Sequence, residues 1–334
     1  MLEQIQPESV DVIDFERIPD GVRRAYSLRV VRLADGSVVS IPVNVVAGLS
    51  ARPCLVAVAG IHGDEGVGVE ALGDLWRELD PALLNGRLII VPIANTAAFA
   101  ADARLSPLDG LDLNRVFPGS IHGSPSQQLA NRLFERVLTK ADFLFSMHSW
   151  SKTGEVVPYV EFDHRNPRTA RTSFEAACAA GFEIVRLSWW ATGLMTRVVN
   201  EAGIPGLEAE IGGLGVSRPE QKETYKRHLR ALIKHLGILP GSEIKPSTPR
   251  VVRHIDLFTS CGGVLRLLTE LAAPVHEGDL LAVIEDHHGN EILRIVATCA
   301  GFVGAIRRYT SVHPGDLVFR LFTDATYDEQ DCRT

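Results

Sequence analysis

Short apolar runs alternate with amphipathic helical patterns over most of this chain, and this alternation constrains its fold more than any other feature. "CLVAVAG" (54–60) and "RLIIVPIAN" (87–95) are continuous apolar runs, as expected for strands buried on both faces. Further strands are predicted over 142–149, 156–162, 183–190 and 206–213, and helices over 69–79, 126–141, 167–181, 193–203 and 218–237. This order predicts an α/β fold with a mixed, mostly parallel sheet flanked by helices.

The ends of the chain have a different character from this central region. "AYSLRVVRL" and "SVVSIPVNVV" flank the turn signal "ADGS", which predicts an N-terminal β-hairpin. With 334 residues, 46% of them apolar, the chain can bury a large core and still form a second, smaller domain. A segment rich in proline, glycine and serine marks the boundary. We expect an α/β domain over residues 1–240, a linker over 241–249, an all-β domain over 250–324 and a frayed tail over 325–334.

The predicted β-domain contains an internal repeat. "VHEGDLLAVIED" from Val275 and "VHPGDLVFRLFTD" from Val312 share V-H-x-G-D-L, which predicts two similar halves related by a pseudo-twofold axis. This region resembles the biotinyl and lipoyl carrier domains, which are barrel-sandwich folds, with "IEDHH" in the place of the hairpin that carries the modified lysine. No lysine follows Lys245, so we expect a structural role instead: covering the active-site mouth, limiting substrate size or forming a subunit contact.

Charge and composition exclude several kinds of partner. The net charge of −7 gives no overall positive field for nucleic acid or an anionic membrane. No apolar run approaches the roughly 20 residues that span a bilayer, and the acidic N-terminus does not resemble a signal peptide. We therefore expect a cytoplasmic protein with a small-molecule partner, and leave a homo-oligomeric state open. The cysteines are scattered without a C-x-x-C pair, so we expect reduced, mostly buried thiols at Cys54, Cys178, Cys261, Cys299 and Cys332.

Three metal-ligating side chains stand at the ends of two different predicted strands. His62 and Glu65 follow the first buried strand in "GIHGDEGVG", and His148 ends another in "FLFSMHS". Imidazole and carboxylate both bind zinc, and a catalytic zinc usually takes three protein ligands. An isolated H-x-x-E is more often a surface turn, and a lone histidine a core residue, but three such groups at strand ends are a rarer coincidence. We predict that His62, Glu65 and His148 hold one Zn²⁺ per subunit.

The remaining candidate histidines give weaker signals. His287 and His288 lie in a predicted polar hairpin, and His228 and His235 are seven apart on a charged helix face. We expect all of them to be solvated.

Two further segments carry candidate catalytic groups. Glu208 and Glu210 point to the same face of a predicted strand, so periodicity does not choose between them. Glu210 precedes "IGG", where the backbone bends into a loop, and is our candidate general base; Glu208 is expected to be solvent-facing or salt-bridged. The loop 103–120 carries Arg104, Asn114 and Arg115. Guanidinium groups bind carboxylates or stabilise an oxyanion, although loop arginines are often only solvated.

In this order, "GIHGDEGVG", "DGLDLNRVFPGS", "SMHS" and "EAEIGG" resemble the succinylglutamate desuccinylase and aspartoacylase family, which is related to zinc carboxypeptidases. The resemblance covers roughly residues 40–240. It implies that His62, Glu65 and His148 are the zinc ligands and that Glu210 is the general base. It also implies that Asn114 and Arg115 hold the substrate's carboxylate and that Arg104 stabilises the oxyanion.

Ser146 departs from the family pattern. Relatives commonly have an aspartate two residues before the second histidine ligand, where it orients the imidazole. Ser146, or another group such as Asp64, must take that task here, or metal affinity is reduced. "DGLDLNRVFPG" is similar to the bacterial branch that includes deacetylases of N-acetylated diaminobutyrate.

These features predict a zinc-dependent hydrolase that cleaves the linear amide of a small N-acylated amino acid, with Glu210 as the general base. A zinc carboxypeptidase acting on short peptides would use the same groups. A non-catalytic relative that only binds a metal or ligand is a third possibility, and Ser146 is the feature in its favour.

Overall fold

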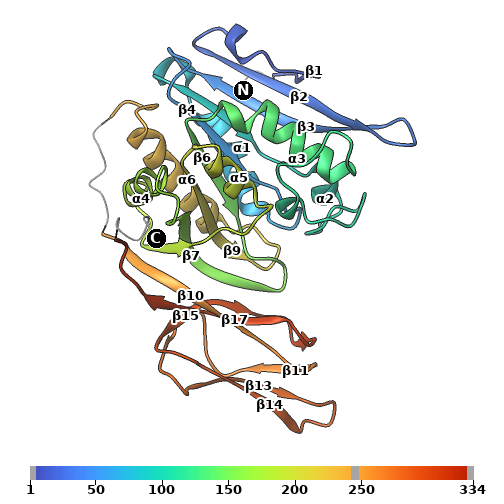
Figure 1. Ribbon diagram of the computed structural model, residues 1–334, viewed down its shortest axis with the longest axis vertical. Helices are drawn as coiled ribbons and strands as arrows, with labels where there is room; N and C mark the ends of the chain where they lie inside the picture. The colour runs from blue at the N-terminus through green and yellow to red at the C-terminus, as the bar shows by residue number, and fades with distance from the viewer. Residues whose placement is uncertain (1–4, 242–247, 329–334) are drawn as a thin grey trace.

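The computed structural model describes residues 5–241 and 248–328, and its centre is a large mixed sheet with helices on both faces (Figure 1). In order across the sheet, the strands are β1 (Glu8–Val10), β2 (Val22–Arg32), β3 (Val38–Ala47), β5 (Arg87–Val91), β4 (Cys54–Val58), β6 (Phe143–His148), β9 (Gly206–Gly213), β7 (Gly154–Asp163), β8 (Ile184–Ser188), β10 (Arg250–Phe258), β17 (Leu317–Asp324), β15 (Gly301–Arg307) and β12 (Pro274–Val275). All the strands predicted from the central alternation are present, and so is the N-terminal hairpin β2–β3.

Parallel pairing is confined to parts of this sheet. β5, β4, β6 and β9 run parallel, and every residue of β4, β5 and β6 is buried, as expected for strands covered on both faces. β7, β8 and β10 are also parallel to one another. The N-terminal hairpin and most C-terminal strands pair antiparallel; in the hairpin the short connection between β2 and β3 does not allow a crossover. The expectation of a mostly parallel sheet therefore holds for the centre and not for the whole.

The helices form two layers with separate cores. The helices are α1 (Gly66–Glu78), α2 (Thr96–Ala100), α3 (Pro125–Arg136), α4 (Ala170–Ala179), α5 (Met195–Glu201) and α6 (Pro219–His235), with short 3-10 turns at Phe15–Arg17, Pro81–Leu83, Leu113–Arg115 and Leu138–Lys140. α1, α4 and α6 pack on one face of the sheet, and α3 and α5 pack on the other. β1 and α2 carry no strong sequence pattern and were not predicted.

The C-terminal strands extend the main sheet and close part of it into a barrel. β10 enters parallel to β8, and β15 pairs antiparallel with β7, so that β7, β8, β10, β17 and β15 form a closed five-stranded ring. A second, antiparallel sheet contains β14 (Glu291–Val296), β13 (Leu280–Glu285), β11 (Gly263–Leu267) and β16 (Ser311–Val312). The region is all-β as predicted, but two of its strands, β10 and β15, are hydrogen-bonded to β8 and β7 of the α/β sheet across the predicted boundary.

The V-H-x-G-D-L repeat forms the same turn twice. The backbone N–H of His276 donates to the Asp279 carboxylate at 2.7 Å, and that of His313 donates to Asp316 at 2.9 Å. The short strand of each half pairs with a long strand of the other, β12 with β15 and β16 with β11. This exchange of strands is the arrangement that two pseudo-symmetric halves would give.

The expectations for the linker, the tail and the cysteines have different outcomes. Residues 242–247 of the predicted linker and 329–334 of the predicted tail lie outside the described residues. The tail is not frayed at Tyr327, because the ring of this residue packs against the rings of Phe162 and Phe174 beside α4. Cys54 is buried, whereas Cys178, Cys261 and Cys299 are only half-buried, and Cys332 is not described.

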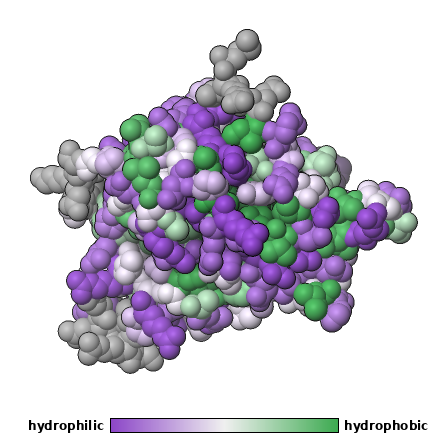
Figure 2. Space-filling view, turned by 90° about the horizontal axis from the view of Figure 1, so that it is seen from above, coloured by the Kyte–Doolittle hydropathy of each residue, from purple (hydrophilic) through white to green (hydrophobic). Residues whose placement is uncertain are grey.

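The face of the molecule on the side of the N-terminal hairpin is largely polar. Seen from the end that carries the N-terminal hairpin, hydrophilic residues predominate and the apolar patches between them are small (Figure 2). Among the described residues, no helix has the length and apolar character needed to cross a membrane.

His228 is the clearest error among the histidine expectations. His235, His287 and His288 are exposed as predicted, but His228 on α6 is 4% exposed. Its ring stacks on Phe182, with centroids 3.9 Å apart, and its Nδ1 lies 2.8 Å from the carbonyl oxygen of Ala180. α6 is therefore buried on this side by the end of α4, which the charged pattern of the helix did not reveal. Burial lowers the pKa of His228 to about 4.

This buried imidazole predicts an acid-sensitive fold. Between pH 6.5 and about 4 the unfolded chain takes up a proton that the folded His228 does not, so folding stability falls with falling pH in that window. We expect the wild-type protein to lose about 2–3 kcal/mol of unfolding free energy to this group between pH 7 and pH 4.5, and His228→Gln to lack that loss. Urea unfolding at several pH values measures it. The exposed His235→Gln on the same helix is the control, and equal pH profiles for all three proteins would contradict the assignment.

Candidate metal centre

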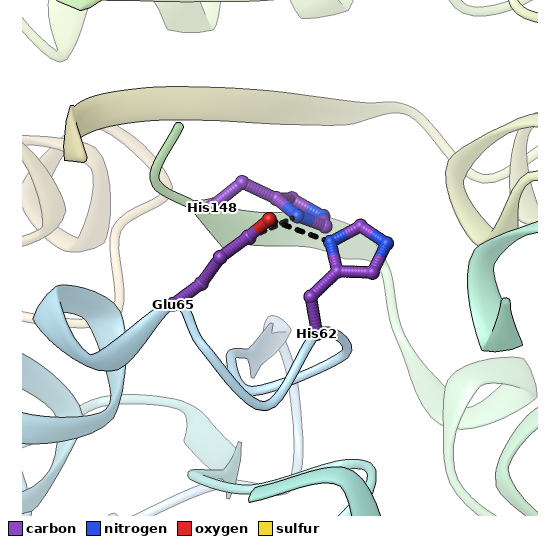
Figure 3. Close-up of side chains that lie close together, drawn as sticks. All are labelled: His62, Glu65 and His148. Carbon is purple, nitrogen blue, oxygen red and sulfur yellow. Dashed lines mark hydrogen bonds and ion pairs between the residues drawn. The ribbon is translucent and has the colours of Figure 1, made fainter. Parts of the chain in front are cut away.

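Parallel pairing of β4 and β6 brings the three predicted ligands together. Val58, the last residue of β4, is in register with Ser146 of β6, and β6 ends two residues later at His148, so both strands end at the same edge of the sheet. His62 and Glu65 follow in the loop after β4, where Glu65 is the N-cap of α1, and His148 is the last residue of β6. One ligand atom from each of the three residues lies within 4.8 Å of the others, and the side chains converge (Figure 3).

Glu65 stands between the two imidazoles. Its Oε1 is 2.7 Å from His62 Nδ1 and its Oε2 is 2.8 Å from His148 Nδ1 (Figure 3). The backbone N–H of Ser149 also donates to Oε2, at 3.2 Å. All three side chains are 3% exposed or less. Two nitrogens and a carboxylate therefore face one point at the end of the sheet.

The electrostatics of the cluster follow from this arrangement. Burial alone would raise the pKa of Glu65, but the two imidazoles outweigh it and hold that pKa well below its usual range. Burial would lower the pKa of His148, but the carboxylates of Glu65 and Glu208 outweigh it and raise that pKa to about 10. The carboxylate and the imidazoles thus stabilise one another's charged forms.

The donor set fits a zinc ion. Both Nδ1 atoms face Glu65, and both Nε2 atoms are held by other groups, as is usual for metal-ligating histidines. Nε2 of His62 lies 3.1 Å from Asp112 Oδ1, and Nε2 of His148 lies 3.0 Å from Ser146 Oγ. A zinc ion held by two nitrogens and one oxygen would keep a fourth coordination position for water or substrate, which is the pattern of catalytic zinc sites.

The loop 103–120 folds over the cluster. Asp112 receives a hydrogen bond from Arg104 at 3.1 Å in addition to its contact with His62. Arg104 also reaches Glu65, with its guanidinium 3.5 Å from Oε1. The sequence pattern gave Asp112 no role, although it lies in the same polar loop as the predicted arginines. Sequence reasoning missed the contact between the Asp112 carboxylate and His62.

Asn114 and Arg115 also line the cavity. Asn114 is 2% exposed, and its Oδ1 accepts a hydrogen bond of 2.9 Å from the backbone N–H of Met195, which ties the loop to α5. Arg115 donates to the carbonyl oxygen of Asn114 at 2.8 Å. Among the described residues no carboxylate pairs with Arg115, so its charge is available to the cavity.

Register separates the two glutamates of β9. Glu210 pairs with His148 on β6 and Glu208 pairs with Ser146. Oε2 of Glu210 is buried and has no hydrogen-bond partner among the described residues. Burial, together with the carboxylates of Glu65 and Glu208, raises the pKa of Glu210 to about 7. Glu208 is 8% exposed and therefore not solvent-facing.

Comparison with known proteins matches this arrangement to a family. Residues 51–236 match the model of the succinylglutamate desuccinylase/aspartoacylase catalytic domain. The chain belongs to this family. Family membership and the His-Glu-His cluster make it a hydrolase that acts on a linear amide, as the sequence analysis predicted.

Relatives cover nearly the whole chain. An N-alpha-acetyl-L-2,4-diaminobutyric acid deacetylase from Halomonas elongata is 31% identical over 322 residues, which are 92% of each protein. A crystal structure of a succinylglutamate desuccinylase/aspartoacylase from Rhodobacter sphaeroides has a TM-score of 0.85 at 28% identity and covers 94% of this chain and 98% of that one. The product-bound ectoine utilization protein EutE (DoeB) from Ruegeria pomeroyi has a TM-score of 0.84 at 29% identity, with 92% and 97% covered.

In this desuccinylase/aspartoacylase family member, strands of the closed barrel form one wall of the site. A cavity of about 670 Å³ extends from the metal cluster to Glu161, Arg186, His254 and Arg320. Arg186 forms an ion pair with Glu161, and its NH1 lies 2.7 Å from His254 Nδ1. Sequence reasoning missed these residues, because the pairing of β7 with β8 joins Glu161 to Arg186, and His254 and Arg320 reach the cavity only when β10 and β17 close the barrel.

The contact of Asp112 with His62 predicts a role in metal retention. Asp112→Asn should weaken Zn²⁺ binding by about 10- to 100-fold, the usual effect of losing a carboxylate that orients a ligating imidazole. Competition against a chromophoric chelator measures the affinity. Asp102→Asn, at a neighbouring exposed aspartate paired with Lys152, is the matched control and should bind Zn²⁺ as the wild type does. Wild-type affinity in Asp112→Asn would refute this role.

Proposed function

We propose that this protein is a zinc-dependent deacylase that hydrolyses the amide bond of a small N-acylated amino acid. One observation carries the proposal: Glu210, a half-buried residue whose Oε2 is buried and unpartnered among the described residues, stands in register beside His148 in the cavity that holds the His62, Glu65 and His148 donors. A potential base and a potential metal site thus share one cavity. The name of the H. elongata relative supports acetyl as the acyl group.

The side chains of the site then have separate roles in the reaction. A bound zinc ion would supply a Lewis acid that polarises the amide carbonyl and lowers the pKa of a water molecule. Glu210 takes the proton from the attacking water and returns it to the leaving amine, which a carboxylate can do in both directions. Arg104 donates to the oxygen that gains negative charge, since Asp112 and Glu65 hold its guanidinium beside the cluster.

Arg115 selects for a free carboxylate on the substrate. Its guanidinium lines the cavity without a carboxylate partner among the described residues, whereas Arg186 and Arg320 are each paired with an acid. A guanidinium in this state is free to bind a carboxylate in the bidentate geometry it favours. Asn114 positions it, through the backbone carbonyl that Arg115 contacts. This supports an N-acylated amino acid rather than a simple amide.

The C-terminal strands, which we predicted as a separate domain over 250–324, limit the size of the substrate. His254, Arg307, Asp316 and Arg320 line the far end of the cavity. These side chains are held by ion pairs and hydrogen bonds, Arg307 with Asp316, Arg320 with Asp256 and His254 with Arg186, so the wall does not yield easily to a long peptide. The observation favours a small substrate over the peptides that a carboxypeptidase would cleave.

Glu210→Gln tests the general base. The amide cannot take a proton, so turnover of an N-acetyl amino acid should fall by about 10²- to 10⁴-fold while zinc content per subunit is unchanged. Steady-state rates and metal analysis on the same preparation measure both quantities. Turnover within a few-fold of the wild type would remove Glu210 from the mechanism, and lost zinc would show that it has a different role.

Arg115→Met tests recognition of the carboxylate. Loss of a charge-assisted pair should raise KM for an N-acetyl amino acid by about 10- to 100-fold and leave KM for the matching N-acetyl amine, which lacks the carboxylate, unchanged. Arg136→Met, an exposed arginine at the end of α3, is the control. A panel of dipeptides assayed beside these substrates separates the deacylase from a peptidase. Equal effects on both acetyl compounds, or faster cleavage of dipeptides, would contradict the proposal.

A further inference from the structure

The two predicted histidine ligands differ in what holds their outer nitrogen. Nε2 of His62 faces a carboxylate, that of Asp112, at 3.1 Å. Nε2 of His148 faces a neutral hydroxyl, that of Ser146, at 3.0 Å. A serine hydroxyl fixes the direction of an imidazole N–H but adds no negative charge, so it does less than a carboxylate to raise the basicity of the ligand. On these contacts alone, His148 would be the weaker of the two ligands.

Glu208 brings a carboxylate to the same side of His148. It is in register with Ser146 on the neighbouring strand, and its Oε2 lies 3.9 Å from His148 Nε2. The side chain is 8% exposed, and among the described residues no lysine or arginine pairs with it. Thr196 of α5 holds the carboxylate in place by donating to Oε2 at 3.0 Å. A buried carboxylate without a cationic side-chain partner is unfavourable unless another group offsets its charge.

We propose that Ser146 and Glu208 together do for His148 what Asp112 does for His62. The Ser146 hydroxyl accepts the Nε2–H bond, and the Glu208 carboxylate supplies the negative charge that stabilises the imidazole as a ligand. Glu208 is thus a positioning residue for metal binding, and Thr196 anchors it. The inference rests on the proposed function, since it requires His148 to ligate zinc.

Asp64 does not fill this role. It is buried at 6% exposure, but its Oδ1 has no partner among the described residues. No contact joins its carboxylate to either imidazole, whereas both outer nitrogens are accounted for by Asp112 and by Ser146 with Glu208. Asp64 is therefore the matched comparison: a buried acid in the same loop without contact to the ligands.

Glu208→Gln removes the charge and keeps the shape and the bond to Thr196. We expect its affinity for Zn²⁺, measured by competition with a chromophoric chelator, to fall by about 10- to 100-fold. Asp64→Asn and Glu210→Gln should keep the wild-type affinity. Thr196→Val, which releases the carboxylate but leaves its charge, should weaken binding by a smaller factor.

Rescue separates positioning from a purely structural role. In Glu208→Gln combined with Ser146→Asp, a carboxylate stands directly against His148 Nε2, and we expect Zn²⁺ affinity to return to within a few-fold of the wild type. A Glu208→Gln protein that binds Zn²⁺ as tightly as the wild type would overturn the inference. Weakened binding that Ser146→Asp does not restore would overturn it too, because Glu208 would then act through the fold.

The same titration distinguishes this inference from the proposed function. Wild-type protein that binds no Zn²⁺ would refute both. Tight wild-type binding that Glu208→Gln leaves unchanged would refute only the role of Glu208, and the zinc-dependent deacylase would stand.

Discussion

The buried carboxylate of Glu65 between two imidazoles is the interaction on which the site depends. A buried charge is costly unless paired and hydrogen-bonded, and here His62, His148 and a backbone N–H meet that need. For these contacts to form, β4 and β6 must end side by side, and the loop between β4 and α1 must pass close to α2. Gly63 makes this possible, because a Cβ at that position would lie 2.1 Å from the backbone of Ala98. The glycines and charged groups of "GIHGDEGVG" thus serve one constraint.

The second constraint is the closure of the barrel by the C-terminal strands. Arg320 on β17 donates to both oxygens of Asp256 on β10, at 2.7 and 2.8 Å, and also reaches the Tyr159 hydroxyl on β7 at 3.3 Å. Tyr159 is in turn in register with Glu210. Strands from the middle and from the C-terminal part of the chain therefore lie around the candidate base. Arg320 and Asp256 are half-buried, so removing one of them would leave a charge that water compensates only in part, which destabilises the fold. The C-terminal strands therefore line the cavity of the candidate site.

Local patterns predicted the features that depend on local physics. Strands buried on both faces have an apolar signature of their own, and the ends of parallel strands meet at one edge, so the convergence of His62, Glu65 and His148 could be predicted without coordinates. The pairing of β10 with β8 could not, because it joins edges far apart in sequence after a stretch that has the composition of a linker. His228 lies on a charged helix face, and only the packing of α6 against α4 buries it.

Glu208 and Glu210 show what register adds to periodicity. They project from the same face of β9, and the alternation of a strand treats them as equivalent. Their neighbours differ: Glu210 stands opposite His148 with an unpartnered oxygen, whereas Glu208 stands opposite Ser146 and is held by Thr196. The two carboxylates therefore have different environments on one face of one strand. In the proposed reaction Glu208 positions the ligand His148 and Glu210 acts as the general base, although both side chains project from β9.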